Sequence, residues 1–192
     1  PPRSSRARCS PPRLSPPRPP TGSIARDHLV RRLVADDAPP IMIVQGPAGY
    51  GKSTLMLQAK AEYDKRALCA GWLSLHESDN DVARLFRTFQ LLLDHLPVSA
   101  NSSEMPQIHR GAAPAHLADL FLGQLLSSNR DVILFIDEFQ TLKSAGSLDF
   151  FSDFFLRLPN RIRVVVSSRK VPDIGLARLM IMEKAGLIRP TD

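Results

Sequence analysis

The stretch Ile41-Met42-Ile43-Val44-Gln45-Gly46-Pro47-Ala48-Gly49-Tyr50-Gly51-Lys52-Ser53 decides the fold of this chain. Its first four residues are apolar, which predicts a short strand buried on both faces. The last eight match the pattern G-x-x-x-x-G-K-[ST] at every fixed position, and residues 52–65 predict a helix. Glycine-rich turns are common and the pattern also arises by chance, but the flanking strand and helix favour a loop that binds phosphate groups.

The residue types of this loop fit a nucleoside triphosphate. Glycines let backbone N–H groups converge on the phosphates, and the following helix directs its positive end toward them. Lys52 is expected to bridge the phosphates, and the Ser53 hydroxyl to ligate Mg²⁺. We expect nucleotide contacts from Gly46, Pro47, Ala48, Gly49, Tyr50, Gly51, Lys52, Ser53 and Thr54.

A second apolar run, residues 132–136, ends in the acidic pair Asp137-Glu138. At the carboxyl end of a strand, Asp137 is expected to hold the magnesium ion and its water shell, and Glu138 to orient or deprotonate the attacking water. The alternative is an acidic pair that only starts a loop or caps a helix. The acidic pair leaves open whether the bound nucleotide is hydrolysed, because a nucleotide-binding protein can keep a slow or silent base.

Two arginines have two interpretations each. Arg169 follows the apolar run 162–166 and Ser167-Ser168, where it either faces the γ-phosphate as a sensor of ATP over ADP or is a surface charge. Arg26 either contacts the nucleotide from the N-terminal side or is a charge at the start of a helix.

The remaining pattern is a regular alternation of helices and strands, which predicts an α/β fold: a P-loop NTPase three-layer sandwich with a mainly parallel five-stranded sheet. The expected strands are 41–44, 70–75, 132–136, 162–166 and 179–183. The expected helices are 26–35, 52–65, 79–96 with Asp79 as its cap, 115–127 and 147–158, with a polar loop over 97–111.

Composition divides the chain unevenly. Residues 1–20 hold eight of the 17 prolines and five arginines with no acidic residue, whereas the remainder has 20 basic and 19 acidic residues. We therefore expect a disordered Pro/Arg-rich extension over 1–20, with an arm that binds phosphate or a partner as the alternative, and a P-loop NTPase domain over 21–192. The excess charge sits in the extension, so it does not indicate nucleic-acid binding by the domain.

Two cysteines, Cys9 and Cys69, and the lack of a long apolar run favour a cytoplasmic protein without a membrane partner. The first residue is Pro, so we expect a fragment or a processed chain.

Several segments together resemble one family. They are Leu14 to Pro19, Ile24-Ala25-Arg26, Gln45 to Leu55, Trp72 to Leu75, Asp79-Asn80-Asp81, the strand ending in Asp137, and Ser168-Arg169. In this order they resemble the N-terminal part of MalT-like, LuxR-type transcription regulators, which are STAND-class P-loop NTPases. The resemblance covers about residues 13–185. Glu138 stands where many relatives have a second Asp, and Ser53 where Thr is commoner.

The resemblance implies a switch that holds ADP when inactive and self-associates when ATP and an inducer are bound. It implies that the phosphate-loop strand lies next to the strand ending in Arg169, with the Asp137 strand beyond. DNA binding would belong to a C-terminal region that this chain does not contain. The alternatives are an AAA-type remodelling or helper ATPase and a truncated nucleotide-binding interaction module. A nucleotide kinase is disfavoured, since no arginine-rich lid follows the third strand.

Overall fold

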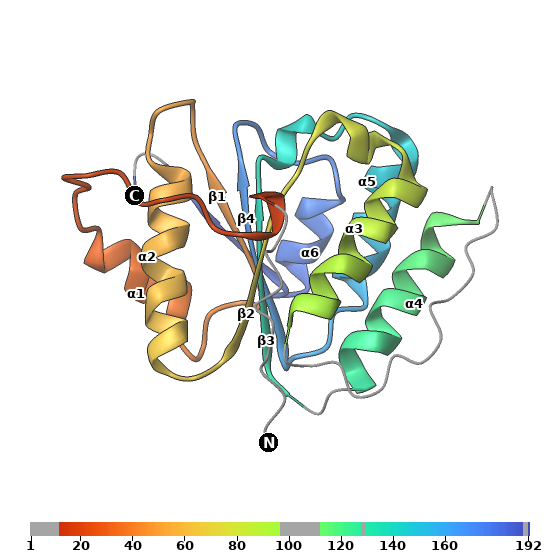
Figure 1. Ribbon diagram of the computed structural model, residues 1–192, viewed down its shortest axis with the longest axis horizontal. Coiled ribbons are helices and arrows are strands. Elements are labelled where there is room, and N and C mark those ends of the chain that lie inside the picture. Colours follow the sequence, from red (N-terminus) through yellow and green to blue (C-terminus); the bar gives the residue numbers. More distant parts are fainter. Residues whose placement is uncertain (1–11, 97–111, 128–129, 190–191) are drawn as a thin grey trace, which may run out of the picture.

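The computed structural model describes residues 12–96, 112–127, 130–189 and 192, and its centre is a sheet of five parallel strands. The strands lie in the order β2-β3-β4-β1-β5 (Figure 1). Their bounds are β1 Ile41–Gln45, β2 Cys69–Ser74, β3 Val132–Asp137, β4 Ile162–Ser168 and β5 Ala185–Ile188. The predicted α/β class and parallel five-stranded sheet are confirmed, and β1 lies between β4 and β5 as the phosphate-loop strand beside the Arg169 strand.

Helices cover both faces of the sheet. The helices α1 (Asp27–Val34) and α2 (Lys52–Lys65) pack on one face, and the others pack on the opposite face (Figure 1). The others are α3 Val82–His95, α4 Pro114–Ser127, α5 Ala145–Leu156 and α6 Leu176–Ile181. Three short 3-10 helices complete the described part: η1 Pro12–Leu14, η2 Glu77–Asn80 and η3 Phe139–Thr141. The predicted polar loop over 97–111 lies outside the described residues.

Phenylalanine rings fill the larger of the two apolar cores. Phe89 of α3 is fully buried and has its ring centroid 4.5 Å from that of Phe121 on α4. It also contacts the rings of Phe150, Phe151 and Phe154 on α5. Apart from β5, the strands read as largely apolar runs because helices cover both faces of the sheet, which is why these four could be located from sequence.

The fifth strand is not where the sequence predicted it. Residues 179–183 belong to the end of α6 and the turn after it, and the strand is Ala185–Ile188. Leu176 and Leu179, three residues apart, are buried, while Ile181 is 84% exposed. A short apolar run does not distinguish strand from helix by its periodicity, and here the helical spacing gives the burial pattern.

The cap of α3 also differs from the prediction. The side chain of Asp81, not Asp79, accepts a hydrogen bond from the Arg84 N–H at the start of the helix. Asp79 belongs to η2, where its carboxylate accepts from the N–H of His76 at 2.8 Å, and it is fully buried. The helix therefore begins after a separate short turn.

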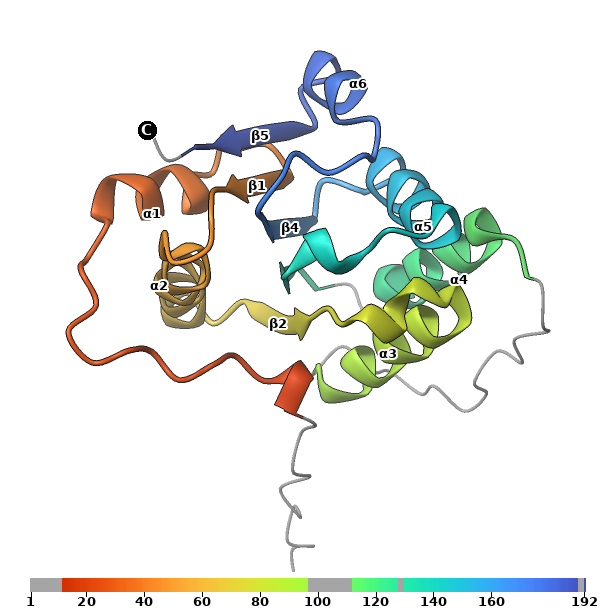
Figure 2. The same ribbon diagram turned by 90° about the horizontal axis from the view of Figure 1, so that it is seen from above.

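The N-terminal segment, residues 12–26, lies against the domain. Its first turn, η1, packs beside β2, and the chain then passes along the outer side of α2 to reach α1 (Figure 2). Arg13 forms an ion pair with buried Asp79, and Leu14 is 6% exposed. The expectation of a solvated extension does not hold for these two residues, and residues 1–11 lie outside the described ones.

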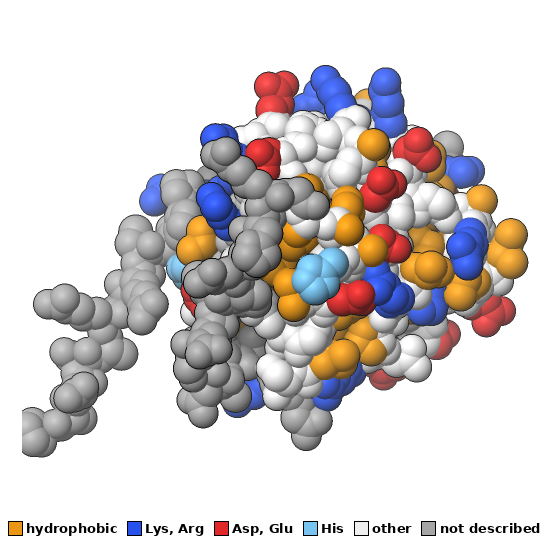
Figure 3. All heavy atoms as spheres, turned by 90° about the vertical axis from the view of Figure 1, so that its right-hand side faces the viewer, with side chains coloured by type: hydrophobic (Ala, Val, Ile, Leu, Met, Phe, Trp, Pro, Cys, Tyr) orange, Lys and Arg blue, Asp and Glu red, His pale blue; other side chains and the backbone are white. Residues whose placement is uncertain are grey.

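The surface over α3 and α4 carries basic and acidic side chains interspersed with small apolar patches (Figure 3). Among the side chains coloured there, no block of a single charge stands out, which agrees with the near-balance of charges after residue 20. No helix within the described ranges is long and apolar enough to cross a membrane.

Candidate functional site at the carboxyl edge of the sheet

The glycine-rich loop follows β1 directly and leads into α2. The Gly46 N–H donates to the Ser168 carbonyl at 3.1 Å, which fixes the loop to the end of β4. Gly49 and Gly51 have φ values of 80° and 73°, a region that favours glycine. A Cβ at Gly51 would also lie 3.2 Å from Nη2 of Arg26. No side chain caps the start of α2, so its first N–H groups face the loop.

Lys52, the first residue of α2, is a buried cation. Its side chain is 7% exposed, and Nζ donates to the Pro47 carbonyl at 2.9 Å. Burial lowers the pKa of Lys52, while the nearby Glu138 and Asp137 raise it and Arg169 lowers it further. The charges of the loop, the acidic pair and the arginine thus act on one another at a single location.

Asp137, the last residue of β3, is held in place by its neighbours on β4. Its Oδ1 accepts from the Ser167 hydroxyl and from the Glu138 N–H at 3.0 Å. Ser167 Oγ in turn accepts from the same Glu138 N–H at 3.1 Å. These bonds occupy one carboxylate oxygen and leave Oδ2 without a hydrogen bond to the residues that the structure describes.

Glu138 and Arg169 contact each other above the ends of β3 and β4. Nη2 of Arg169 lies 3.5 Å from Oε2 of Glu138. The Gln140 side-chain amide donates to the same oxygen, and its Oε1 accepts from the Arg169 backbone N–H at 3.0 Å. Glu138 has φ 61°, a left-handed conformation uncommon for a residue with a side chain. Left-handed non-glycine residues of this kind concentrate at functional sites.

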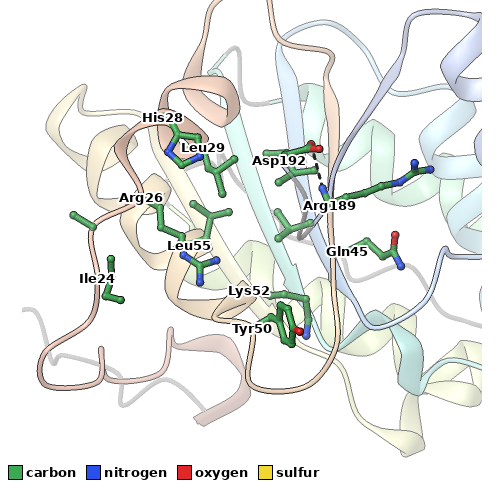
Figure 4. Close-up of a pocket in the computed structure, with 13 residues that line it drawn as sticks. Ile24, Arg26, His28, Leu29, Gln45, Tyr50, Lys52, Leu55, Arg189 and Asp192 are labelled. Carbon is green, nitrogen blue, oxygen red and sulfur yellow. Dashed lines mark hydrogen bonds between the residues drawn. The ribbon is translucent and has the colours of Figure 1, made fainter.

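A pocket of about 420 Å³ opens between the loop, the N-terminal segment and β5. Arg26, Tyr50 and Lys52 lie on one side of it, and Gln45 and Arg189 on the other (Figure 4). Its apolar walls come from Leu29, Val44, Leu55 and Ile188. Apolar walls beside a phosphate-binding turn suit the flat base and the sugar of a nucleotide.

Arg26 is placed by α2. Its backbone N–H donates to Gln58 Oε1 at 3.2 Å, and Gln58 Nε2 donates to the Ile24 carbonyl at 2.9 Å. Gln58 therefore fixes the N-terminal segment where the Arg26 guanidinium lies against Gly51. Arg26 directly precedes α1 and also lines the pocket. Its position is therefore compatible with a charge at a helix start and with a contact to a nucleotide.

The oxygen donors at this edge suit a hydrated magnesium ion. Mg²⁺ is held in nucleotide sites by one or two protein oxygens together with phosphates and water. Ser53, the second residue of α2, supplies a hydroxyl, and Asp137 supplies the Oδ2 described above. In the described part of the chain no group of three His, Cys, Asp or Glu forms a metal cluster, and such a cluster is not needed for an ion that phosphates also hold.

The structure thus brings the predicted candidates to one edge of the sheet, although their individual roles stay predictions. Sequence reasoning missed Gln140, Ser167, Gln58 and the β5 side of the pocket. The misplaced fifth strand hid the last of these, because Ile188 is the last residue of the true strand and Arg189 follows it. Ser167 had a sequence signal: a polar residue at the end of an apolar strand, next to a strand that ends in an acidic pair.

Comparison with known proteins agrees with this geometry. Residues 24–167 match the model of the AAA ATPase domain family, and since this is most of the chain, the chain belongs to that family. It is also similar to the HTH-type transcriptional regulator MalT of Yersinia pestis, with 28% identity, and of Klebsiella pneumoniae, with 29%. Each match covers 84% of this chain and 18% of the relative. The chain therefore spans about a fifth of the length of these relatives, and the resemblance to MalT-like regulators is confirmed.

Proposed function

We propose that the chain binds ATP and ADP with Mg²⁺ and serves as the nucleotide-dependent switch domain of a MalT-type transcription regulator. The observation that carries the proposal is geometric: the glycine-rich turn after β1 is hydrogen-bonded to the end of β4, where Asp137 is bonded to Ser167 and Glu138 contacts Arg169, beside a helix start that no side chain caps. Membership of the AAA ATPase domain family gives the same class of ligand.

Each residue has a role that its position supports. The backbone N–H groups of the loop and Lys52 would bind the β- and γ-phosphates, for which a buried lysine with a neutral carbonyl partner is a suitable cation. Ser53 and Asp137 would hold Mg²⁺, which neutralises phosphate charge. Arg26 and the apolar walls of the pocket would contact the base and sugar. Arg169 would contact the γ-phosphate and so distinguish ATP from ADP.

Glu138 would act on water if the chain hydrolyses ATP. In that reaction water attacks the γ-phosphorus, its proton passes to the Glu138 carboxylate, and the bond to the β–γ bridging oxygen breaks to give ADP and phosphate. A switch needs only slow turnover, because the ATP-bound state persists until the bond between the β- and γ-phosphates is hydrolysed. Self-association in the ATP state and DNA contacts by a region outside this chain are the parts of the proposal that rest on similarity to MalT.

The test is calorimetric titration of the chain with ATP and with ADP in the presence of MgCl₂. We expect Lys52→Ala to weaken ATP binding by about 100-fold or more, since it removes a charge-assisted contact to phosphate from a buried position. The matched control is Lys65→Ala, in the last turn of the same helix, where the side chain is 70% exposed and pairs with Glu62. Equal ATP affinity in the two variants would refute the phosphate-loop assignment.

A second candidate is an ATPase of the remodelling type, favoured by the family match and by the acidic pair after β3. Such an enzyme turns over ATP repeatedly and assembles into rings. Sedimentation with ADP and with ATP, together with steady-state phosphate release, separates the two: a switch binds tightly and turns over slowly, and a remodelling enzyme turns over many ATP molecules as a ring.

A further inference from the structure

The side chain of Gln140 joins the turn after β3 to the turn after β4. Its Nε2 donates to Glu138 Oε2, and its Oε1 accepts from the Arg169 N–H at 3.0 Å. It therefore contacts both groups that the proposed function places at the γ-phosphate, although its own side chain is neutral.

Only one orientation of the Gln140 amide satisfies both neighbours. If the amide were flipped, its oxygen would face the Glu138 carboxylate and its NH₂ group would face the Arg169 N–H. An acceptor would then face an acceptor at Glu138, and a donor would face a donor at Arg169. The chemistry of the two partners thus fixes the direction of the amide, and the amide in turn fixes the direction of the carboxylate.

The turn that carries Gln140 is held from both sides. The Glu138 carbonyl accepts from the Thr141 N–H at 3.0 Å and from the Thr141 hydroxyl at 2.9 Å. Phe139 is 1% exposed, with its ring centroid 4.8 Å from that of Phe151. Asn80 Nδ2 donates to the Thr141 carbonyl at 3.0 Å. These contacts therefore hold the backbone of the turn that carries Gln140.

The second contact of Glu138 is different in kind. Arg169 reaches Oε2 from 3.5 Å, and its side chain is 53% exposed. A triphosphate with its larger charge would draw the guanidinium away from a single carboxylate. Gln140 would then be the residue that still holds Glu138, with Oε1 directed to water.

We propose that Gln140 is the positioning residue for Glu138 in ATP hydrolysis, and that it also fixes the backbone of Arg169. The inference rests on the proposed function. Gln140 takes no proton and makes no bond to the nucleotide. Its effect is on the rate at which Glu138 accepts the proton of the attacking water, and on the placement of Arg169.

Two substitutions separate these two contacts. Gln140→Glu keeps an acceptor for the Arg169 N–H but replaces the donor to Glu138 with a second carboxylate. Gln140→Met has a similar shape and removes both hydrogen bonds. Each is compared with wild type by single-turnover hydrolysis of ATP with the chain in excess. Calorimetry with ADP and the non-hydrolysable analogue AMP-PNP measures binding, and thermal melting reports folding.

We expect Gln140→Glu to slow the single turnover by about 10-fold or more, since general-base catalysis of this kind contributes about 100-fold or more in rate. Its affinity for ADP, which lacks the γ-phosphate, should stay within about 3-fold of wild type. Gln140→Met should slow turnover similarly and also reduce the preference for AMP-PNP over ADP, because the Arg169 backbone loses its acceptor. A residue with a purely structural role would not slow turnover while leaving ADP binding unchanged.

Three results would overturn the inference. One is wild-type turnover in Gln140→Glu. Another is a parallel loss of binding for both nucleotides and of thermal stability in both variants, which would make Gln140 a structural residue. The third is a wild-type chain that binds AMP-PNP and ADP but shows no single turnover, which would leave the nucleotide-binding function standing. A wild-type chain that binds neither nucleotide would instead refute the proposed function itself.

Discussion

Arg13→Ala should destabilise the domain even though Arg13 lies in the segment that composition assigns to a disordered extension. Its guanidinium forms an ion pair with Asp79, whose side chain is fully buried. The only other donor to that carboxylate among the described residues is the N–H of His76, and Asp79 Oδ1 has no hydrogen-bond partner there. Removing Arg13 would therefore leave a buried carboxylate with one hydrogen bond.

The size of the effect follows from the exposure of the two partners. Breaking a fully buried ion pair by removing one partner costs about 3–5 kcal/mol. The Arg13 side chain is 25% exposed, so water can reach the vacated position and reduce the loss. We expect a decrease of about 2–3 kcal/mol in the free energy of unfolding, and a fall of about 4–12 °C in melting temperature for a domain of this size.

Urea unfolding of Arg13→Ala is compared with that of Arg18→Ala, which removes the same charge from the exposed part of the same segment. The control should stay within about 0.5 kcal/mol of wild type. Equal midpoints for the two variants would refute the reasoning and restore residue 21 as the start of the domain. In an Asp79→Asn background, the Arg13 substitution should cost less, because no buried charge is left behind.

Two further predictions concern the cores. Phe89→Ala should destabilise the domain by about 3–5 kcal/mol in urea unfolding, because Phe89 contacts four other phenylalanine rings and a cavity would remain. The control Leu91→Ala, at a 43% exposed position of the same helix, should cost less than about 1 kcal/mol. Similar losses of stability in the two variants would contradict this account of the core. Burial raises the pKa of the Cys69 thiol, so in a Cys9→Ser background at pH 8 the folded chain should react with a thiol reagent far more slowly than the urea-unfolded chain, since the thiolate is the reactive form. The raised pKa favours the protonated thiol in the folded state. Its contribution to the free energy of unfolding is therefore present below the pKa of the unfolded state and is lost as the pH rises through the pKa of the folded state. If a Cys69→Ala variant lost as much free energy of unfolding over the same pH range, that would contradict the assignment.

The parts of the fold that sequence could predict are those in which local pattern and environment agree. The runs at 41–44, 132–136 and 164–166 are apolar because a parallel sheet covered on both faces buries these side chains. The strand at 185–188 has two glycine or alanine residues in four positions, so it lacks this signal, whereas the neighbouring Leu179 to Ile181 carries more apolar surface. Local composition could not tell which of the two neighbouring segments is the strand.

The candidate site divides in the same way. Lys52 and Asp137 stand at fixed places in patterns whose chemistry is known, and Arg169 follows the end of a strand, so their meeting at one edge could be predicted once the strands were ordered. Gln140 has no such pattern. Its importance comes from the pairing of β3 with β4, which brings the Arg169 N–H within reach of a side chain 29 positions earlier in the chain. Contacts between turns of different strands depend on the register of the sheet, which the sequence of a single turn does not contain.

The two edges of the sheet explain why the site lies at the carboxyl end. At the amino edge, Arg163 donates to the carbonyls of Ala35 and Asp36, and Arg66 to that of Val34, so the open end of α1 is satisfied by the protein's own side chains. At the carboxyl edge, α2 begins at Gly51 with no side-chain cap, and the residues beside it are cations and carboxylates that face one another. Backbone donors that the protein leaves uncapped at a helix start are satisfied by water or by an anion. The carboxyl edge therefore leaves backbone donors uncapped at the place where the proposed function puts the phosphates, and the glycines at 49 and 51 let the turn there adopt positive φ values without a side chain in the way.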